Sequence, residues 1–350
     1  MKLGSFKFIP KSFLGIDIGT STIKVVELSR WGAKKSLKNY GEMRSEMLYD
    51  KPFRTAEKSS LLLSSKDIAR SLRGILQEAK IETKNAVFSI PDFSSFFTHF
   101  ELPPMTKEEL PEAVQYEARK HIPIPFSEVT FDWQILNKKR LGLPKEPIKI
   151  LMVAVPNELI NQYQEIAKLA KLRLQTLEAE VFGLIRSSLK NGEGSLVVLD
   201  MGAQTTTINV VKKGVLQSSR SIDIGGGNLS ERIAQSLSIG RKEAEEKKIA
   251  EGLLSKELKT ILGPLIDTVV TEIQRAIQEF REKEIQRVVL GGGSAMLPGL
   301  REYLKESLKK EIEFVDPFRS VFYPPVLEDT IKEMGPSYCV AVGMALRGLE

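Results

Sequence analysis

The sequence contains very few of the residues that build disulfides and metal clusters. Among its 350 residues, Cys339 is the single cysteine, and His99 and His121 are the two histidines. A lone cysteine excludes an intrachain disulfide and a thiolate metal cluster, and two histidines exclude the usual zinc hydrolase patterns. No run of eighteen apolar residues is present, so no membrane span is expected. By elimination, we expect a cytosolic chain.

Concentrated charge and the common nucleotide motifs are also missing from the sequence. The net charge is +6 and no single block is basic, so no nucleic-acid partner is indicated. The first twelve residues, MKLGSFKFIPKS, lack the continuous apolar core of a signal peptide. We expect a frayed terminus there, with contact to a membrane surface as the alternative. Neither G-x-x-x-x-G-K-[ST] nor G-x-G-x-x-G occurs, which argues against P-loop and dinucleotide folds.

The sequence does contain one unusual pattern twice. FLGIDIGTST spans Phe13–Thr22, and VVLDMGAQTTT spans Val197–Thr207. Each is an apolar stretch followed by Asp, one residue, Gly and a cluster of small hydroxyl residues, which predicts two strands joined by a tight turn. The two hairpins open the two halves of the chain, on either side of the polar link KNGEGS (190–195). The sequence therefore predicts an internal duplication of an α/β unit.

The chemistry of such a hairpin suits a phosphate ligand. A tight turn points successive backbone N–H groups into one concavity, glycine permits close approach, and Ser and Thr hydroxyls add donors. An Asp at the strand end repels phosphate directly but is well placed to hold a hydrated Mg²⁺. Two facing hairpins would hold a polyphosphate from both sides. A third glycine turn, GGGS at 291–294, lies between a predicted strand and helix and suits contact with the rest of a nucleotide.

Other elements follow from periodicity and from Pro and Gly positions. Strands are expected at 85–91, 96–104, 129–136, 148–155, 172–179, 196–201, 205–212 and 215–223. Helices are expected at 65–80, 106–122, 157–171, from about 181, at 255–283 and over the closing stretch 338–349. The helix at 106–122 opens with a capping box between Thr106 and Glu109.

These motifs together resemble the actin-like ATPase superfamily. LGIDIGTSTIKVVEL is similar to its phosphate-1 motif, VVLDMGAQTTTINVV to its phosphate-2 motif, and VVLGGGSAMLPGL to its adenosine motif. LEAEVFGLIRSSL and AVGMALRGL resemble the two connecting helices between the lobes. The resemblance implies an α/β actin-like ATPase fold, with two duplicated lobes and an inserted α+β subdomain in the first lobe. Ala203 departs from the pattern, because several relatives have a second Gly there, and this puts the tightness of the phosphate contact in doubt.

The resemblance also implies a division of the chain. We expect a first-lobe core at 1–84, an inserted subdomain at 85–155, the rest of the first lobe at 156–193, a second-lobe core at 194–224, a second-lobe outer subdomain at 225–284, and second-lobe core with the closing helix at 285–350.

Roles for individual residues follow from the same resemblance. ATP and Mg²⁺ are the implied ligands. Asp17 and Asp200 match the two aspartates that orient Mg²⁺ through water, with capping of the turns as the alternative. Glu180 is the candidate that orients and partly deprotonates the attacking water. Glu178 is its competitor, and a carboxylate also suits a helix start on electrostatic grounds alone. Hydrolysis is expected to be weak where it occurs.

The implied nucleotide contacts form two sets. Phosphate contacts are expected from Gly19, Thr20, Ser21, Gly202, Gln204, Thr205 and Thr206, with Lys24 facing either phosphate or solvent. Adenosine contacts are expected from Glu245, Lys248, Gly291, Gly292, Gly293 and Ser294. Gly226 and Gly227, in the glycine turn that enters the second lobe's outer subdomain, are further expected cofactor-binding residues. A Glu and Lys run on a helix is usually a solvated face, so Glu245 and Lys248 rest on the resemblance alone.

The middle insert distinguishes between members of the superfamily. Its run EELPEAVQYEARKHIPIPFSEVTFDWQIL is similar to the inserted subdomain of the PilM family of type IV pilus assembly. FtsA has an insert at the same place but carries a further C-terminal membrane helix, whereas this sequence stops at Glu350. The resemblance implies a nucleotide-gated adaptor that is cytoplasmic, peripheral at the inner membrane, and part of the type IV pilus inner-membrane platform.

The implied partner is the N-terminal cytoplasmic peptide of PilN, held between the first lobe and the insert. Phe96, Phe97 and IPIPF (122–126) either contact that peptide or fill the insert's own core. Two alternatives share the fold and the nucleotide site. One is a filament-forming, FtsA-like ATPase, and the other is a small-metabolite kinase, for which no dedicated substrate motif is found.

Overall fold

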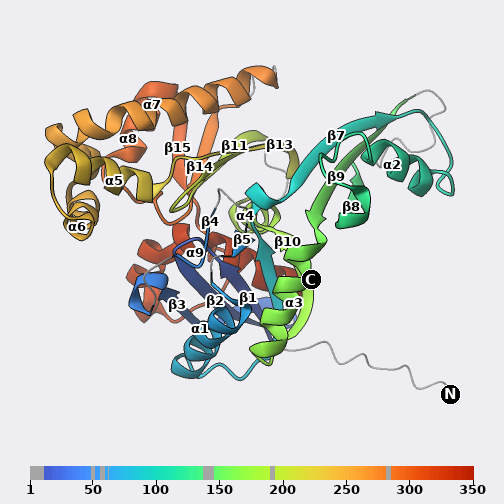
Figure 1. The fold of residues 1–350 in the computed structure, drawn as a ribbon, viewed down its shortest axis with the longest axis horizontal. Coiled ribbons are helices and arrows are strands. Elements are labelled where there is room, and N and C mark those ends of the chain that lie inside the picture. Colours follow the sequence, from blue (N-terminus) through green and yellow to red (C-terminus); the bar gives the residue numbers. More distant parts are fainter. Residues whose placement is uncertain are drawn as a thin grey trace.

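The computed structural model consists of two α/β lobes and a smaller unit that projects beside them (Figure 1). It describes residues 12–48, 52–55, 60–61, 63–136, 146–189, 194–280 and 285–350. The expected frayed terminus and most of the polar link at 190–195 lie outside the described residues. Within the described ranges, no helix has the length and apolar character that a membrane crossing requires.

A five-stranded sheet forms the centre of the first lobe. Its order is β10 (Arg173–Ala179), β6 (Asn85–Ile90), β1 (Ser12–Ile18), β2 (Thr22–Trp31) and β3 (Lys34–Arg44). The strands β1, β2 and β3 form an antiparallel meander, and β6 runs parallel to both β1 and β10. A two-stranded ribbon, β4 (Arg54–Thr55) with β5 (Ser60–Leu61), completes the lobe's strands among the described residues.

The second lobe repeats this topology. Its sheet has the order β15 (Glu311–Phe314), β14 (Arg287–Gly291), β11 (Ser195–Met201), β12 (Thr206–Lys212) and β13 (Val215–Ile222). The strands β11, β12 and β13 again form an antiparallel meander, with β14 parallel to both β11 and β15. The predicted duplication of an α/β unit is therefore confirmed strand by strand.

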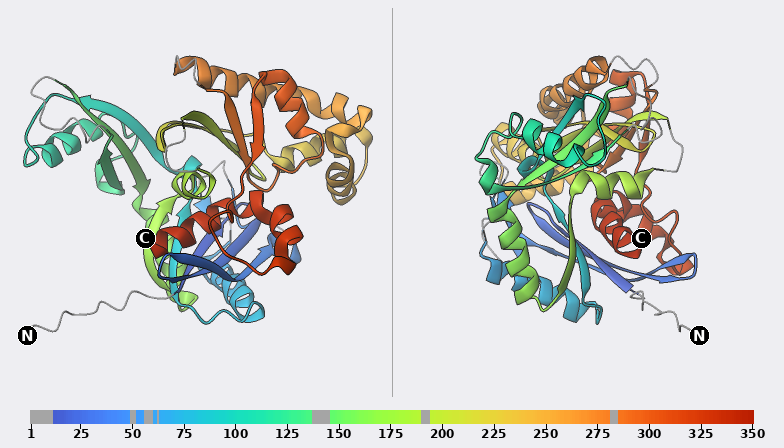
Figure 2. Two further views of the ribbon diagram at one scale, coloured as in Figure 1. Left: turned by 180° about the vertical axis from the view of Figure 1, so that it is seen from behind. Right: turned by 90° about the vertical axis from the view of Figure 1, so that its right-hand side faces the viewer.

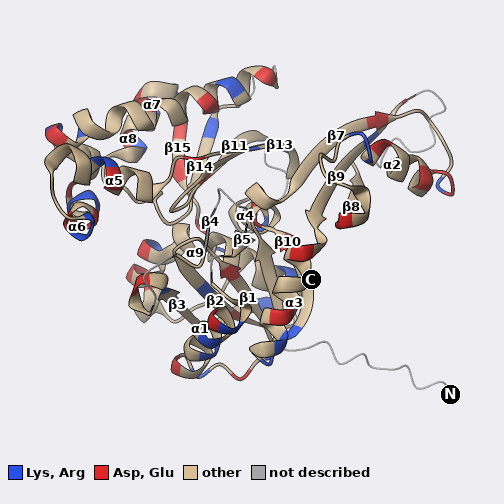
Figure 3. Cartoon of the chain, viewed as in Figure 1, with Lys and Arg blue, Asp and Glu red and all other residues tan. Residues whose placement is uncertain are grey.

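Helices cover the sheets in layers. In the first lobe, α1 (Ser65–Glu78) and α3 (Asn157–Leu169) pack on one face, and α4 (Glu180–Ser188) and α9 (Glu328–Leu349) lie on the other (Figure 2). The second lobe carries α5 (Gly226–Leu237), α6 (Arg241–Glu251), α7 (Lys256–Glu279) and α8 (Leu300–Leu308). Acidic and basic residues are interspersed along these outer helices (Figure 3). The amphipathic periodicity that predicted helices at 65–80, 157–171 and 255–283 is thus confirmed by α1, α3 and α7, while 281–283 lie outside the described residues.

The projecting unit is a three-stranded antiparallel sheet with one helix on it. The order is β7 (Phe96–Leu102), β9 (Ile148–Pro156) and β8 (Val129–Ile135), and α2 (Leu110–Ala118) packs on one face. Thr106 and Glu109 form the predicted reciprocal capping bonds, but the regular helix begins after them, at Leu110. Pro111 has no N–H to donate and therefore favours the first turn.

One strand belongs to a different sheet from the one predicted. We expected 85–91 to open the insert, but Asn85–Ile90 is β6 of the first lobe. Five of its six residues are buried, as expected for a central parallel strand with helices on both faces. The separate three-stranded sheet therefore begins at Phe96.

Candidate functional site

The two repeated hairpins have the same local geometry. The Gly19 N–H donates to the Thr22 carbonyl, and the Gly202 N–H donates to the Thr205 carbonyl, at 2.9 Å in each hairpin. Each Asp stands two residues before its glycine, at the end of the first strand of its hairpin. Tight turns of this kind leave the following N–H groups and hydroxyls pointing outward from the sheet.

Both turns line one cleft between the lobes. Of the predicted site residues, the cleft is lined by Asp17, Gly19, Thr20, Ser21, Lys24, Glu180, Asp200, Gly202, Thr205, Gly292 and Gly293. The structure thus brings together eleven predicted residues from four separate motifs. It also adds residues that sequence reasoning missed, namely Thr22, Phe93, Ala203, Thr207, Ser337, Cys339 and Val340.

Two carboxylates lie on opposite sides of this cleft. Asp17 is buried and accepts a hydrogen bond of 2.7 Å from the Ser89 hydroxyl. Asp200 lies against the backbone of Gly292, where an added Cβ atom would collide with the carboxylate and with the Met201 carbonyl. Gly292 also has a φ of +94°, a backbone conformation that residues with a Cβ atom rarely adopt. Glycine at this position therefore lets the third turn approach Asp200 closely.

A third carboxylate, Glu180, reaches the cleft from the start of α4. It is 9% exposed, and the Asp92 N–H lies 3.4 Å from its Oε2. The Asp92 carboxylate in turn accepts the N–H of Val181 at 3.1 Å and so satisfies one of the free donors of the helix start. Asp92 therefore holds both Glu180 and the helix that carries it.

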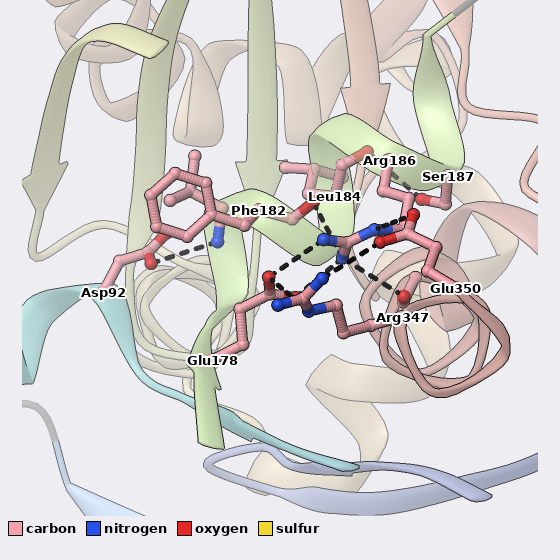
Figure 4. A network of polar contacts seen from close by, with 10 residues as sticks. Asp92, Glu178, Phe182, Leu184, Arg186, Ser187, Arg347 and Glu350 are labelled. Atoms are coloured by element: carbon pink, nitrogen blue, oxygen red, sulfur yellow. Dashed lines mark hydrogen bonds and ion pairs between the residues drawn. The ribbon is translucent and has the colours of Figure 1, made fainter. Parts of the chain in front are cut away.

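The competing carboxylate, Glu178, forms ion pairs with two arginines outside the cleft. It forms ion pairs with Arg186 at 2.6 Å and Arg347 at 3.6 Å, and Arg186 also binds Glu350 at 3.0 Å (Figure 4). Burial disfavours the Arg186 cation, but hydrogen bonding and the charge of Glu178 outweigh it and raise the pKa of Arg186. Glu178 is not among the residues that line the cleft, so geometry favours Glu180 as the carboxylate at the site.

The predicted adenosine residues gather beside the cleft. The Lys248 ammonium donates to the Gly226 carbonyl at 3.0 Å and pairs with Glu245 at 2.8 Å. Ser294 links this group to the second hairpin, because its hydroxyl donates to the Gly202 carbonyl at 3.0 Å. Burial raises the pKa of Glu245, but hydrogen bonds from Lys248 and Ser230 oppose this effect and lower it overall.

Eight predicted residues do not line the cleft. Gly226, Glu245, Lys248 and Ser294 lie beside it, and the other four are Gln204, Thr206, Gly227 and Gly291. The Thr206 hydroxyl is turned into the lobe and donates to the Ile224 carbonyl at 2.6 Å. Because strand side chains alternate, Thr205 and Thr207 face the cleft while Thr206 faces away. That alternation was available in the sequence and would have selected Thr207.

The cleft combines negative charge, a cation and many small donors. Lys24 lines it close to the Tyr338 ring, 5.7 Å from the ring centroid. In the described part of the chain, no three His, Cys, Asp or Glu side chains gather closely enough to hold a metal ion directly. The two aspartates are instead suited to a hydrated cation, and the backbone turns are suited to an anion.

Two duplicated lobes that face each other across such a cleft define the actin-like ATPase fold. Residues 15–349 match the family of type IV pilus assembly protein PilM, so the chain belongs to that family. The family match covers nearly the whole chain, including the insert.

Individual relatives are similar to this chain in sequence or in fold. A solved chain of the PilM-PilN type IV pilus biogenesis complex matches with a TM-score of 0.85 and 25% identity, over 96% of this chain and 98% of that chain. Cell division protein FtsA of Streptococcus pneumoniae serotype 2 is 23% identical, over 84% of this chain and 73% of its own length. MreB5 of Spiroplasma citri, solved bound to ADP, has a TM-score of 0.56 and 13% identity over 96% of both chains.

Proposed function

We propose that the chain is a nucleotide-gated adaptor of type IV pilus assembly that binds ATP with Mg²⁺ in the interlobe cleft. The observation that carries this proposal is the pair of matched hairpins, Asp17 to Thr22 and Asp200 to Thr205, which line one cleft from opposite lobes. A ligand held by both turns is bound best when the lobes close on it. The ADP bound to MreB5 supports a nucleotide as that ligand.

The residues present fit a hydrated magnesium ion and a polyphosphate. Asp17 and Asp200 would hold the ion through its water ligands, and the ion would neutralise phosphate charge. Gly293 lines the cleft, and no atom lies within 4 Å of the position that a Cβ would take there. A phosphate or ribose can therefore approach this backbone directly. Lys24 and the Ser21 and Thr205 side chains add a cation and hydroxyl donors at the same place.

Glu180 is the residue that we assign to an attacking water. Its carboxylate lies in the cleft wall and is held by the Asp92 backbone, so it can orient a water and accept its proton. Asp17 and Asp200 line the same cleft, but we assign them to the hydrated Mg²⁺, which leaves Glu180 as the base among the cleft residues of the described chain. We therefore propose slow hydrolysis at most, with ATP binding as the functional event.

The proposed partner is the N-terminal cytoplasmic peptide of PilN, which would recruit the chain to the inner-membrane platform. The similar solved structure is described as a PilM-PilN complex. We propose that the peptide is held in extended form between the first lobe and the insert. Phe96 and the 122–126 segment pack into the insert's own core, and Phe97 packs on Phe182 at 6.3 Å between ring centroids. The peptide contacts would therefore come from strand backbone and from side chains around these residues.

The nucleotide part of the proposal is tested by calorimetric titration of ATP into the whole chain, with Mg²⁺ or with EDTA. Asp17→Asn and Asp200→Asn should each weaken binding at least about tenfold (~1.4 kcal/mol) with Mg²⁺. In EDTA the loss should vanish, because removing a carboxylate also removes repulsion of phosphate. Asp132→Asn, at an exposed position on β8, is the matched control and should bind normally. Equal affinity of all variants in Mg²⁺ would overturn the assignment.

A filament-forming ATPase is the alternative, supported by the similarity to FtsA and MreB5. It uses the same cleft but predicts ATP-dependent polymers. Sedimentation at high protein concentration with ATP and Mg²⁺ distinguishes the two, because the adaptor should stay in the supernatant without its partner.

A further inference from the structure

The insert begins at the wall of the interlobe cleft. The chain enters it through a short helix, Asp92–Ser94, which joins β6 to β7. Phe93 lines the cleft, and Asp92 is 5% exposed with its hydrogen bonds directed at the start of α4. A little further along β7, Phe97 packs on Phe182 of the same helix. The first strand of the insert is therefore fixed to the helix that carries Glu180.

The same strand also reaches the second lobe. The His99 Nε2 lies 3.0 Å from the Leu216 carbonyl of β13, and a ring N–H there donates to that oxygen. Leu216 pairs with Val211 of β12, directly beside an irregularity in the β12–β13 ladder at which Gln217 is skipped. β13 is the edge strand of its sheet and lies beside β7 (Figure 1).

These contacts join three parts of the molecule through one strand. The short helix before β7 reaches the cleft wall with Asp92 and Phe93, and β7 itself then contacts helix α4 at Phe97 and the second lobe at His99. The second lobe cannot rotate toward the first without moving β13 relative to α4. Because β7 contacts both, such a rotation must either shift the insert or break the His99 bond.

We propose that β7 transmits lobe closure to the insert, with Asp92 as the positioning residue at the cleft and His99 as the link to the second lobe. This inference rests on the proposed function, because it assumes that nucleotide closes the lobes, and it names the route by which nucleotide would regulate the partner site. The coupling is thermodynamic, so a ligand held by the insert should in turn change the affinity for nucleotide.

The test is hydrogen–deuterium exchange of the whole chain with and without ATP and Mg²⁺. In the unmodified chain, nucleotide should change exchange at least twofold in Phe96–Leu102 and Leu110–Ala118. His99→Ala should bind nucleotide within about twofold of the unmodified chain but lose most of that change. His99→Gln keeps an N–H donor and should recover part of it.

His121→Ala is the matched control. His121 is the other histidine of the insert and stacks on Phe100 at 5.4 Å between centroids, within the insert itself. It should preserve the nucleotide response. A full response in His99→Ala, or no response in the insert of a chain that binds ATP, would overturn the coupling while leaving the adaptor proposal standing. Failure of the unmodified chain to bind ATP would instead overturn the proposed function.

Discussion

At the scale of single residues, two adjacent glycines have different tasks. Gly292 is confined by Asp200 and Met201 and has positive φ, whereas Gly293 faces open space in the cleft. Gly292→Ala should therefore lower the free energy of unfolding by about 2 kcal/mol or more. Gly293→Ala should leave stability within about 0.5 kcal/mol but weaken ATP binding, because its methyl group occupies the cleft. Urea unfolding and ATP titration of both variants check this, and equal stability losses would contradict it.

The single cysteine provides a direct probe of the same cleft. Burial, and then the charge of Asp200, raise the pKa of the Cys339 thiol well above its ordinary value. Because the thiolate is the reactive form, alkylation at pH 8 should be at least tenfold slower than in the unfolded chain. Cys339 lines the cleft, so ATP with Mg²⁺ should slow the reaction further. Rapid labelling that ATP leaves unchanged would place the thiol outside the ligand's reach.

At this scale, the sequence predicted residues that the structure brings into one cleft where the residue types and their spacing form a repeated pattern. Asp17, Asp200 and the turn glycines were found because the same pattern occurs twice. Phe93, Ser337 and Val340 have no such sequence pattern. Only tertiary packing brings the short helix Asp92–Ser94 and helix α9 to the cleft. The roles of Glu178 and Glu180 could be distinguished only in the structure. The ion-pair partner of Glu178 is Arg186, which lies eight residues further along the chain.

At the scale of elements, the crossing of α4 and α9 depends on glycine. A Cβ atom on Gly343 would collide with the carbonyl and Cα of Gly183, so the two helices meet backbone to backbone. Gly343→Ala must separate them, and we expect the free energy of unfolding to fall by about 3 kcal/mol. Gly240→Ala, where no atom lies within 4 Å of the new methyl group, should cost less than about 1 kcal/mol. Denaturant unfolding compares the two, and similar losses would argue against a tight crossing.

The ion pairs beside this crossing are not equivalent. Arg186 is 19% exposed and holds Glu178, Glu350 and the Gly343 carbonyl, whereas Arg347 is 45% exposed and 3.6 Å from Glu178. Arg186→Met leaves a poorly solvated Glu178 and should cost about 2–3 kcal/mol of stability. Arg347→Met should cost under about 1 kcal/mol. If urea unfolding gives the same loss of stability for both substitutions, Arg186 does not hold α4 and α9 together in the way that its contacts indicate.

At the scale of the whole molecule, the repeated hairpin made the two lobes predictable, but the boundary of the insert was not predicted correctly. Periodicity gave most helices and strands, and the repeated hairpin predicted the duplication that the two sheet orders confirm. The start of the insert was predicted too early in the sequence. The apolar pattern of a buried strand such as Asn85–Ile90 does not indicate which sheet the strand joins. The contact between His99 of β7 and Leu216 of β13 could not be predicted, since it joins residues 117 positions apart.

The central claim is that nucleotide in the cleft controls binding of an extended partner peptide. The most direct measurement is titration of a synthetic PilN N-terminal peptide into the whole chain, with and without ATP and Mg²⁺, alongside Asp200→Asn. The account predicts micromolar binding that changes at least tenfold with nucleotide in the unmodified chain and much less in the variant. Binding that is identical in all conditions would contradict gating, and no binding in any condition would contradict the adaptor itself.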